Sequence, residues 1–266
     1  MGNTTESLLP SKRRALYGEI ESYSFHPAFG TAEGYPSDDT QPAFWTLEHL
    51  MQYGRVEPQQ LAECFASRRI FGLGGSVRAA VGRLRSGADW RRCGVPSAGN
   101  GALMRIAPVL YHALHGRPHL VFRDAILATV ITHNDSMAIA SSLAAVELLE
   151  RHLLEPHRMR GPLAEALDWH SGAFLLETVP TCLLILMRYA EDPVQAILRA
   201  VSDTKDNDTI AAIVGAFAGA LHGKEFIPGR WISHLAGRTR EDDDGAVFRI
   251  LLQVKPGVYF RSRQGA

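Results

Sequence analysis

The sequence predicts an all-α fold in a single compact domain built of many helices. Apolar residues recur at helical spacing along most of the chain, and the segments between these runs are rich in Gly, Pro, Asn and Asp. No linker, low-complexity tract or repeat of fixed period divides the chain. With 266 residues, 46% of them hydrophobic, the chain is long enough to bury one sizeable core.

Apolar periodicity and start and stop residues define the individual helices. The predicted helices are, in chain order, residues 11–20, 40–53, 58–67, 76–84, 123–132, 136–149, 179–189, 193–202, 210–221 and 227–231. Ser11 is placed to cap the first, Gly54 to end the second, and Pro58 to start the third. The Gly-rich run 72–75 is assigned to a turn, because no strand precedes it and no Gly-Lys-Ser/Thr follows.

The segments outside these helices are predicted from their composition. Residues 1–10 are polar and are expected to fray, whereas 22–37 combines Pro, Gly and aromatic residues and is expected to form an ordered loop. A further loop is predicted at 156–162. The tail 242–266 is ambiguous and contains a candidate short strand at 258–260.

Composition and charge narrow the possible partners. Lys plus Arg equal Asp plus Glu at 28 each, so no overall field favours nucleic acid or an anionic membrane. The arginines between residues 83 and 92 are interpreted as a solvated face. The three cysteines lack metal-binding spacing, and the sequence shows no signal peptide and no apolar run long enough to span a bilayer. These features predict a cytoplasmic protein with reduced thiols. We expect a monomer.

Two acidic stretches stand out, residues 37–40 (Ser-Asp-Asp-Thr) and 206–209 (Asp-Asn-Asp-Thr), and each leads into an apolar helical run. Taken singly, each is better explained as a helix N-cap, because Asp, Ser and Thr are favoured there. A cap needs one side-chain oxygen, however, and each stretch carries two acids whose repulsion a cation would offset. Together they offer the all-oxygen shell that Mg²⁺ takes, so the pair predicts a shared metal site.

Two further features between the acidic stretches are candidate ligand-binding elements. Residues 99–101, Gly-Asn-Gly, precede a helical pattern, and their exposed N–H groups would suit an anion such as a pyrophosphate. A simple turn explains the same residues equally well. His133 interrupts a helical run; taken alone, a buried structural histidine is favoured over a ligand-facing one.

The order of these motifs resembles that of the ADP-ribosylglycohydrolases, which remove ADP-ribose from dinitrogenase reductase and from arginine or serine of other proteins. The resemblance rests on residues 37–40, 99–105, 132–133 and 206–209 and covers roughly residues 24–236. It implies an all-α domain with a dinuclear Mg²⁺ or Mn²⁺ centre. The implied metal ligands are Ser37, Asp38, Asp39, Asp206, Asp208 and Thr209, and the implied ADP-ribose contacts are Ser97, Gly99, Asn100, Gly101, Met104 and His133.

The resemblance also divides the chain and exposes one departure from the family. It implies a domain at residues 24–241, an N-terminal extension at 1–23 and a C-terminal tail at 242–266 packed on the domain. Family members usually begin with a Gly/Ala-rich helix that carries Gly-Asp and, shortly after, a glutamate near the metals. No segment before the first acidic stretch matches that element; the candidate replacements are Glu19, Glu21 and Glu33.

The implied reaction is hydrolysis at the anomeric carbon of the distal ribose of an ADP-ribosylated protein or other ADP-ribose conjugate. Asp38 and Asp39 are the candidate catalytic residues, with Asp38 the first choice for general base, and the amides of 99–101 would hold the diphosphate. Two alternatives stay open: a non-catalytic ADP-ribose-binding or immunity-type module, and a metal-dependent phosphohydrolase. The linkage cleaved, to arginine, serine, another base or an O-acetyl ester, is also open.

Overall fold

The computed structural model describes residues 1–154, 171–240 and 244–254, and these are helical with isolated bridges rather than strands. Their α-helices are α1 (Pro10–Tyr17), α2 (Thr40–Tyr53), α3 (Pro58–Ser67), α4 (Gly75–Arg85), α5 (Trp90–Cys93), α6 (Tyr111–Leu114), α7 (Val121–Val130), α8 (Ser136–Leu154), α9 (Leu175–Arg188), α10 (Pro193–Asp203), α11 (Asn207–His222), α12 (Gly229–Ile232) and α13 (Ala246–Gln253). Short 3-10 turns lie at Asn3–Thr5, Leu103–Arg105, Ala107–Leu110 and Pro118–Leu120. The predicted all-α fold in one domain is confirmed.

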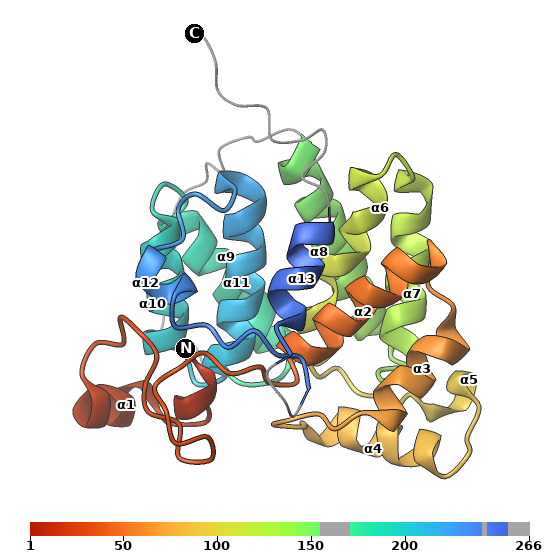
Figure 1. Ribbon diagram of the computed structural model, residues 1–266, viewed down its shortest axis with the longest axis horizontal. Helices are drawn as coiled ribbons and strands as arrows, with labels where there is room; N and C mark the ends of the chain where they lie inside the picture. The colour runs from red at the N-terminus through yellow and green to blue at the C-terminus, as the bar shows by residue number, and fades with distance from the viewer. Residues whose placement is uncertain (155–170, 241–243, 255–266) are drawn as a thin grey trace, which may run out of the picture.

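The helices pack around one core that runs through the whole domain. Helix α11 packs against α8, α9 and α10, and α2 packs against α3 and α13 (Figure 1). Trp45 of α2, Phe65 of α3 and Ile210 of α11 are at most 1% exposed and belong to the same apolar cluster. Burying these large side chains is the main stabilising contribution of the fold, at roughly 1.5–3 kcal/mol for each. The core therefore fixes α2 and α11, the helices that follow the acidic stretches.

Local signals predicted several helix ends, and tertiary contacts moved others. Helix α2 ends as predicted at Gly54, whose φ of +71° is accessible to glycine without strain. The first helix is corrected: Pro10 occupies its first turn in place of a Ser11 cap, and Gly18 ends it before residue 20. Helix α9 begins at Leu175, one turn earlier than predicted, and continues through Pro180.

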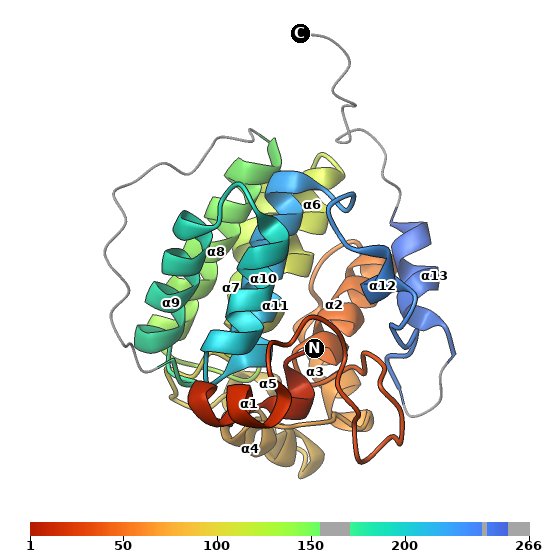
Figure 2. The same ribbon diagram turned by 90° about the vertical axis from the view of Figure 1, so that its left-hand side faces the viewer.

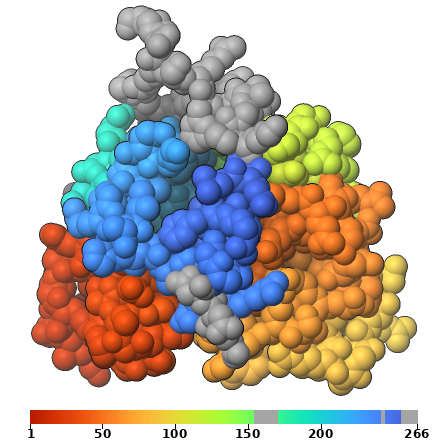
Figure 3. All heavy atoms as spheres, in the orientation of Figure 1, coloured from red at the N-terminus to blue at the C-terminus, as the bar shows by residue number. Residues whose placement is uncertain are grey.

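Other predictions about the chain are corrected or fall outside the described residues. The helical pattern expected after Gly101 forms the 3-10 turns at 103–105 and 107–110, not an α-helix. The predicted loop 156–162 and the candidate strand 258–260 lie outside the described residues. Part of the predicted tail is α13, which packs on α2 between the two halves of the molecule (Figures 1 and 3). In the described part of the chain, no helix is both long and apolar enough to cross a membrane.

The first 17 residues pack against the ends of α10 and α11 (Figure 2). The prediction that residues 1–10 fray is therefore wrong. Arg13 is 1% exposed and its guanidinium donates hydrogen bonds to the carbonyls of Ser202 (3.1 Å) and Thr204 (2.6 Å). The same group donates to both oxygens of Thr5, at 3.1 and 3.0 Å. A buried arginine whose donors are all engaged holds two segments in fixed register. The N-terminal segment is thereby attached to the loop that precedes the second acidic stretch.

Candidate active site

The structure brings the two acidic stretches together at the N-terminal ends of α2 and α11. Asp38, Asp39 and Asp206 are 9%, 4% and 9% exposed, and Asp208 is half-buried. The charges of Asp206 and Asp208 both act on Asp38 and on Asp39, although the pairs are far apart in the sequence. Packing of α2 and α11 into one core thus gathers four carboxylates at one place.

These carboxylates are not helix caps. The Asp39 and Asp206 side chains, which occupy the N-cap positions of α2 and α11, accept no capping hydrogen bond from their helices. Asp39 Oδ2 accepts from the Ser37 hydroxyl at 2.9 Å, while Asp39 Oδ1 is buried without a hydrogen-bond partner. Asp206 Oδ2 accepts from Asn100 Nδ2 at 2.6 Å. The capping interpretation therefore leaves the buried carboxylates unexplained.

A glutamate that the sequence did not single out completes the cluster. Oxygen atoms of Glu6, Asp206 and Asp208 lie within 4.8 Å of one another, a spacing that suits a single cation. Glu6 follows the first 3-10 turn on the N-terminal segment. The three candidates named from sequence lie elsewhere: Glu19 forms an ion pair with Arg199, and Glu33 accepts a hydrogen bond from Tyr35 at 3.1 Å. The backbone carbonyl of Glu21 accepts from the Trp231 indole.

Burial and mutual repulsion make the ionised form of this cluster unfavourable without a cation. Glu6 as a whole is exposed, but partial desolvation of its carboxylate, followed by the charge of Asp208, raises its pKa to about 8. Burial raises the pKa of Asp38 to about 7 and, with the charge of Asp206, that of Asp208 to about 6. In the described residues no Lys or Arg forms an ion pair with any of these acids. Crowded acids and an orphaned buried oxygen are the donor set that a hard cation requires.

The Gly-rich turn at 72–75 holds one of these acids. The amide of Gly74 donates to Asp38 Oδ2 at 3.0 Å. A Cβ on Gly72 would lie 3.3 Å from Asp38 Oδ1, and the φ of Gly72 is +75°. Glycine at 72 thus permits both the backbone conformation and the close approach. The turn predicted from sequence is confirmed, and its contact with Asp38 is an addition.

In the Gly-Asn-Gly loop, residues 99–101, more backbone amides form hydrogen bonds within the protein than the sequence predicted. The amide of Gly99 donates to Ser97 Oγ at 3.2 Å and that of Asn100 donates to the Ala173 carbonyl at 3.0 Å. Two of the three amides expected to hold a diphosphate are therefore engaged within the protein. In the described residues no hydrogen bond engages the amide of Gly101, which leaves it for a ligand. Asn100 is 5% exposed and donates to Thr178 Oγ1 and to Asp206, so it orients a candidate metal ligand.

His133 and Arg105 both contact Gly101 of this loop. His133 is 1% exposed, and a Cβ on Gly101 would lie 2.9 Å from its ring. Burial, and then the charge of Arg105, lowers the pKa of His133 to about 4, so the ring is neutral at pH 7. Arg105 is 2% exposed and donates to the Gly101 carbonyl at 3.1 Å and to Thr132 Oγ1 at 2.6 Å. His133 therefore occupies the buried position that sequence reasoning favoured for a lone histidine.

The remaining predicted residues lie beside the cluster. Ser97 Oγ accepts from the Ser76 hydroxyl at 2.8 Å, which ties the loop to α4. The Thr209 hydroxyl is 3.7 Å from the Met104 sulfur, so Met104 lies next to the second acidic stretch. Sequence reasoning missed Glu6 and gave Arg105 no role. In the structure a Cβ on Gly2 would lie 2.6 Å from the backbone of Asp208, but a lone glycine in a polar segment does not indicate this contact from the sequence.

The chain is similar to several known proteins. A family model described as ADP-ribosylglycohydrolase matches residues 1–256. The ADP-ribosyl-dinitrogen reductase glycohydrolase of Rhodospirillum rubrum is 27% identical over 254 residues, covering 88% of this chain and 85% of that protein. The ADP-ribosylarginine hydrolase Tri1 of Pseudomonas putida (strain GB-1) is 25% identical over 265 residues, covering 88% and 70%. A solved structure described as an ADP-ribosylglycohydrolase-related protein complex matches with a TM-score of 0.67 and 25% identity, covering 90% of this chain and 89% of its own.

Proposed function

Because the chain belongs to the ADP-ribosylglycohydrolase family, whose members hydrolyse ADP-ribose linkages, we propose that it is a metal-dependent hydrolase that releases ADP-ribose from modified arginine side chains of proteins. The observation that carries this proposal is the convergence of Glu6 with the two acidic stretches. Arginine is the proposed acceptor because one relative is named an ADP-ribosylarginine hydrolase.

The acidic cluster is proposed to hold two Mg²⁺ or Mn²⁺ ions. The ligands would be Glu6 together with the six residues predicted from the two acidic stretches. When bound, the ions would polarise the ribose hydroxyls and lower the pKa of a water molecule. The buried, partnerless Oδ1 of Asp39 and the raised carboxylate pKa values are the features that fit this occupant.

The protein's own residues have distinct tasks in this proposal. Asp38 is the general base: its Oδ2 is oriented by the Gly74 amide, and it would accept the proton of the attacking water. Departure of the arginine guanidine from the ribose develops positive charge at the anomeric carbon, which the surrounding carboxylates stabilise. Asn100 keeps Asp206 in position, and the free amide of Gly101 would donate to the ligand's diphosphate.

The decisive experiment is single-turnover release of ADP-ribose from an ADP-ribosylated arginine peptide with Mg²⁺, Mn²⁺ or EDTA. We expect metal-dependent release that Asp38→Asn abolishes while the variant still binds ADP-ribose. Peptides modified on serine, modified thymidine or guanosine, and O-acetyl-ADP-ribose test the other linkages. Binding of ADP-ribose without release from any substrate would establish the binding module instead, and release of phosphate would establish a phosphohydrolase.

A further inference from the structure

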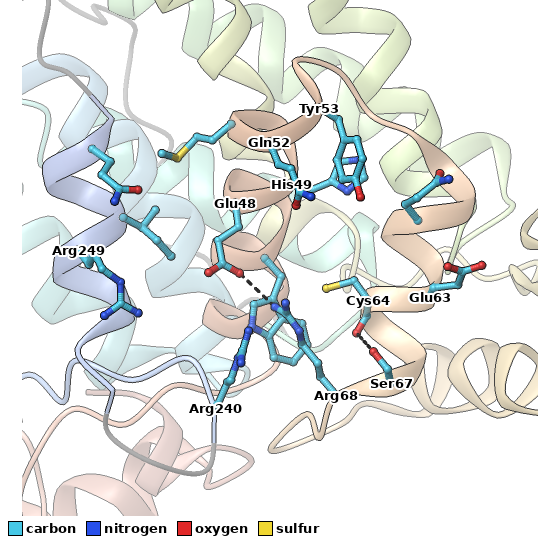
Figure 4. Close-up of a pocket in the computed structure, with 15 residues that line it drawn as sticks. Glu48, His49, Gln52, Tyr53, Glu63, Cys64, Ser67, Arg68, Arg240 and Arg249 are labelled. Atoms are coloured by element: carbon cyan, nitrogen blue, oxygen red, sulfur yellow. Dashed lines mark hydrogen bonds and ion pairs between the residues drawn. The ribbon is translucent and has the colours of Figure 1, made fainter.

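A cavity of about 870 Å³ lies between α2, α3 and α13 (Figure 4). Residues of α2 and α3 form most of its wall, with Arg249 and Ile250 of α13 facing them. None of the residues assigned to the acidic cluster or the Gly-Asn-Gly loop lines it. The volume is within the range of pockets that hold small molecules. The fold therefore presents a ligand-sized space separate from the candidate active site.

The cavity carries more positive than negative charge. Figure 4 shows Arg68, Arg240 and Arg249 turned toward the space around the Glu48 carboxylate. Arg68 is the one that Glu48 neutralises, at 3.1 Å, and its guanidinium also lies 5.1 Å from the centre of the Trp45 ring. These contacts fix Arg68 in the wall of the cavity.

The other two guanidiniums are not neutralised in this way. Arg249 donates a hydrogen bond to the backbone carbonyl of Asp244 at 2.9 Å, but its guanidinium lies 3.7 Å from the Asp244 carboxylate, and both side chains are more than a third exposed. In the described part of the chain no hydrogen bond or ion pair engages Arg240, which lines the cavity. The second acid of the wall, Glu63, accepts a hydrogen bond from Gln59 at 2.8 Å. An exposed pair such as Arg249–Asp244 contributes little, so two cations remain for a ligand.

We propose that this cavity binds a small molecule carrying a phosphate group, of about nucleotide size, with Arg240 and Arg249 as its main anchors. The two negative charges of a phosphate dianion match the positive charges of two guanidiniums. A single carboxylate matches only one, as Glu48 does for Arg68. Tyr53 lines the same cavity, is 44% exposed, and lies with its ring 4.5 Å from that of His49. This pair offers an aromatic surface to a planar ring on the ligand.

The chain contains a thiol that reports on this cavity alone. Cys64 lines the cavity and is half-buried, whereas Cys93 and Cys182 are buried. The charges of Arg68 and Arg240 both act on Cys64, which places the thiol near Arg240, one of the two proposed anchors. A ligand in the cavity would therefore slow alkylation of Cys64, and a ligand in the candidate active site would not.

The test measures the rate of Cys64 alkylation by N-ethylmaleimide, followed by peptide mass spectrometry in EDTA. Pyrophosphate and AMP are the probes, and acetate, which carries a single carboxylate, is the comparison. At ten times its dissociation constant a probe leaves about a tenth of the cavity open, so we expect the rate to fall about tenfold. In R240Q/R249Q the ratio of rates with and without probe should return to one, whereas Arg151→Gln, which removes an arginine on α8, should behave as the unmodified protein.

Three outcomes would overturn the proposal. The first is a rate unaffected by either phosphate probe in the unmodified protein. The second is protection that persists in R240Q/R249Q, whose fold is checked by its melting temperature. The third is equal protection by acetate, which would show that the cavity does not distinguish a phosphate dianion from a single carboxylate. All measurements exclude metal and need no hydrolysis, so they stand apart from the test of the proposed reaction.

Discussion

Replacing Asp208 by asparagine should stabilise the metal-free protein, because the ionised side chain opposes folding. Burial and the charge of Asp206 raise its pKa from 3.8 to about 6. Because the pKa is higher in the folded state, ionisation of Asp208 lowers the free energy of unfolding. This loss is absent below pH 3.8, grows between pH 3.8 and about 6, and is complete above that. About two pKa units correspond to about 3 kcal/mol at full effect, and sharing of the repulsion with Asp206 reduces this to about 1–3 kcal/mol.

The assay is thermal unfolding, followed by circular dichroism, in EDTA and in Mg²⁺ or Mn²⁺. At pH 8 in EDTA, Asp208→Asn should melt roughly 3–8 °C above the unmodified protein, and the difference should vanish near pH 4. Asparagine retains an oxygen for the hydrogen bond from the Thr209 amide, at 3.1 Å in the structure. Metal at a hundred times its dissociation constant should raise the stability of the unmodified protein by about 2.7 kcal/mol and that of the variant far less.

The control removes an acid that is not part of the cluster. Asp203, at the end of α10, forms exposed ion pairs with Arg14 and Arg199. Asp203→Asn should therefore lower stability slightly, by at most about 1 kcal/mol, and leave the metal response intact. The reasoning is refuted if Asp208→Asn is less stable than the unmodified protein in EDTA at pH 8. An equal metal response in the two proteins would refute it as well.

Three further predictions concern Glu6, Gly94 and His133. Glu6→Gln should reduce metal-dependent stabilisation and ADP-ribose release while leaving the melting temperature in EDTA unchanged or higher; Glu33→Gln, at an exposed position, should change neither. Gly94→Ala should cost at least about 2 kcal/mol in denaturant unfolding, because its Cβ would lie 2.1 Å from the Val130 carbonyl oxygen. Gly82→Ala, in open space on α4, should instead gain up to about 1 kcal/mol. The difference in free energy of unfolding between the unmodified protein and His133→Gln should depend on pH. Because the pKa of His133 is lowered from 6.5 to about 4 in the folded state, protonation between these pH values favours the unfolded state, so the unmodified protein should lose up to about 3 kcal/mol relative to the variant as pH falls from 6.5 to about 4. A difference that does not change with pH would contradict this.

The parts of the structure that sequence predicted are those set by neighbouring residues. Pro58 starts α3 and Gly54 ends α2 because a proline at a first turn and a left-handed glycine act locally. The acidic stretches were recognisable because each places two carboxylates within four residues. Their convergence followed from shared ligand chemistry, since a single cation needs oxygens from more than one segment.

The parts that sequence could not predict depend on partners distant in the chain. The amides of residues 99–101 appeared available for an anion, but Asn100 donates its amide to Ala173 and its side chain to Thr178 and Asp206. Nothing in a Gly-Asn-Gly run indicates whether such partners exist. Helix α9 likewise begins at Leu175, one turn before the expected start, where the Leu175 amide donates to the Ala98 carbonyl.

Glu6 shows most clearly why a candidate site assembled from motifs was incomplete. The polar composition of residues 1–10 predicts fraying, because the segment has few apolar side chains to bury. Hydrogen bonds hold it instead: Thr5 is fully buried and accepts from both Arg13 and the side chain of Asn207, at 2.9 Å for the latter. Asn207 lies between Asp206 and Asp208, so the residue that separates these two acids also holds the N-terminal segment that carries Glu6. The glutamate is therefore placed by the acidic stretch itself, and its position depends on polar contacts that hydrophobic periodicity does not register.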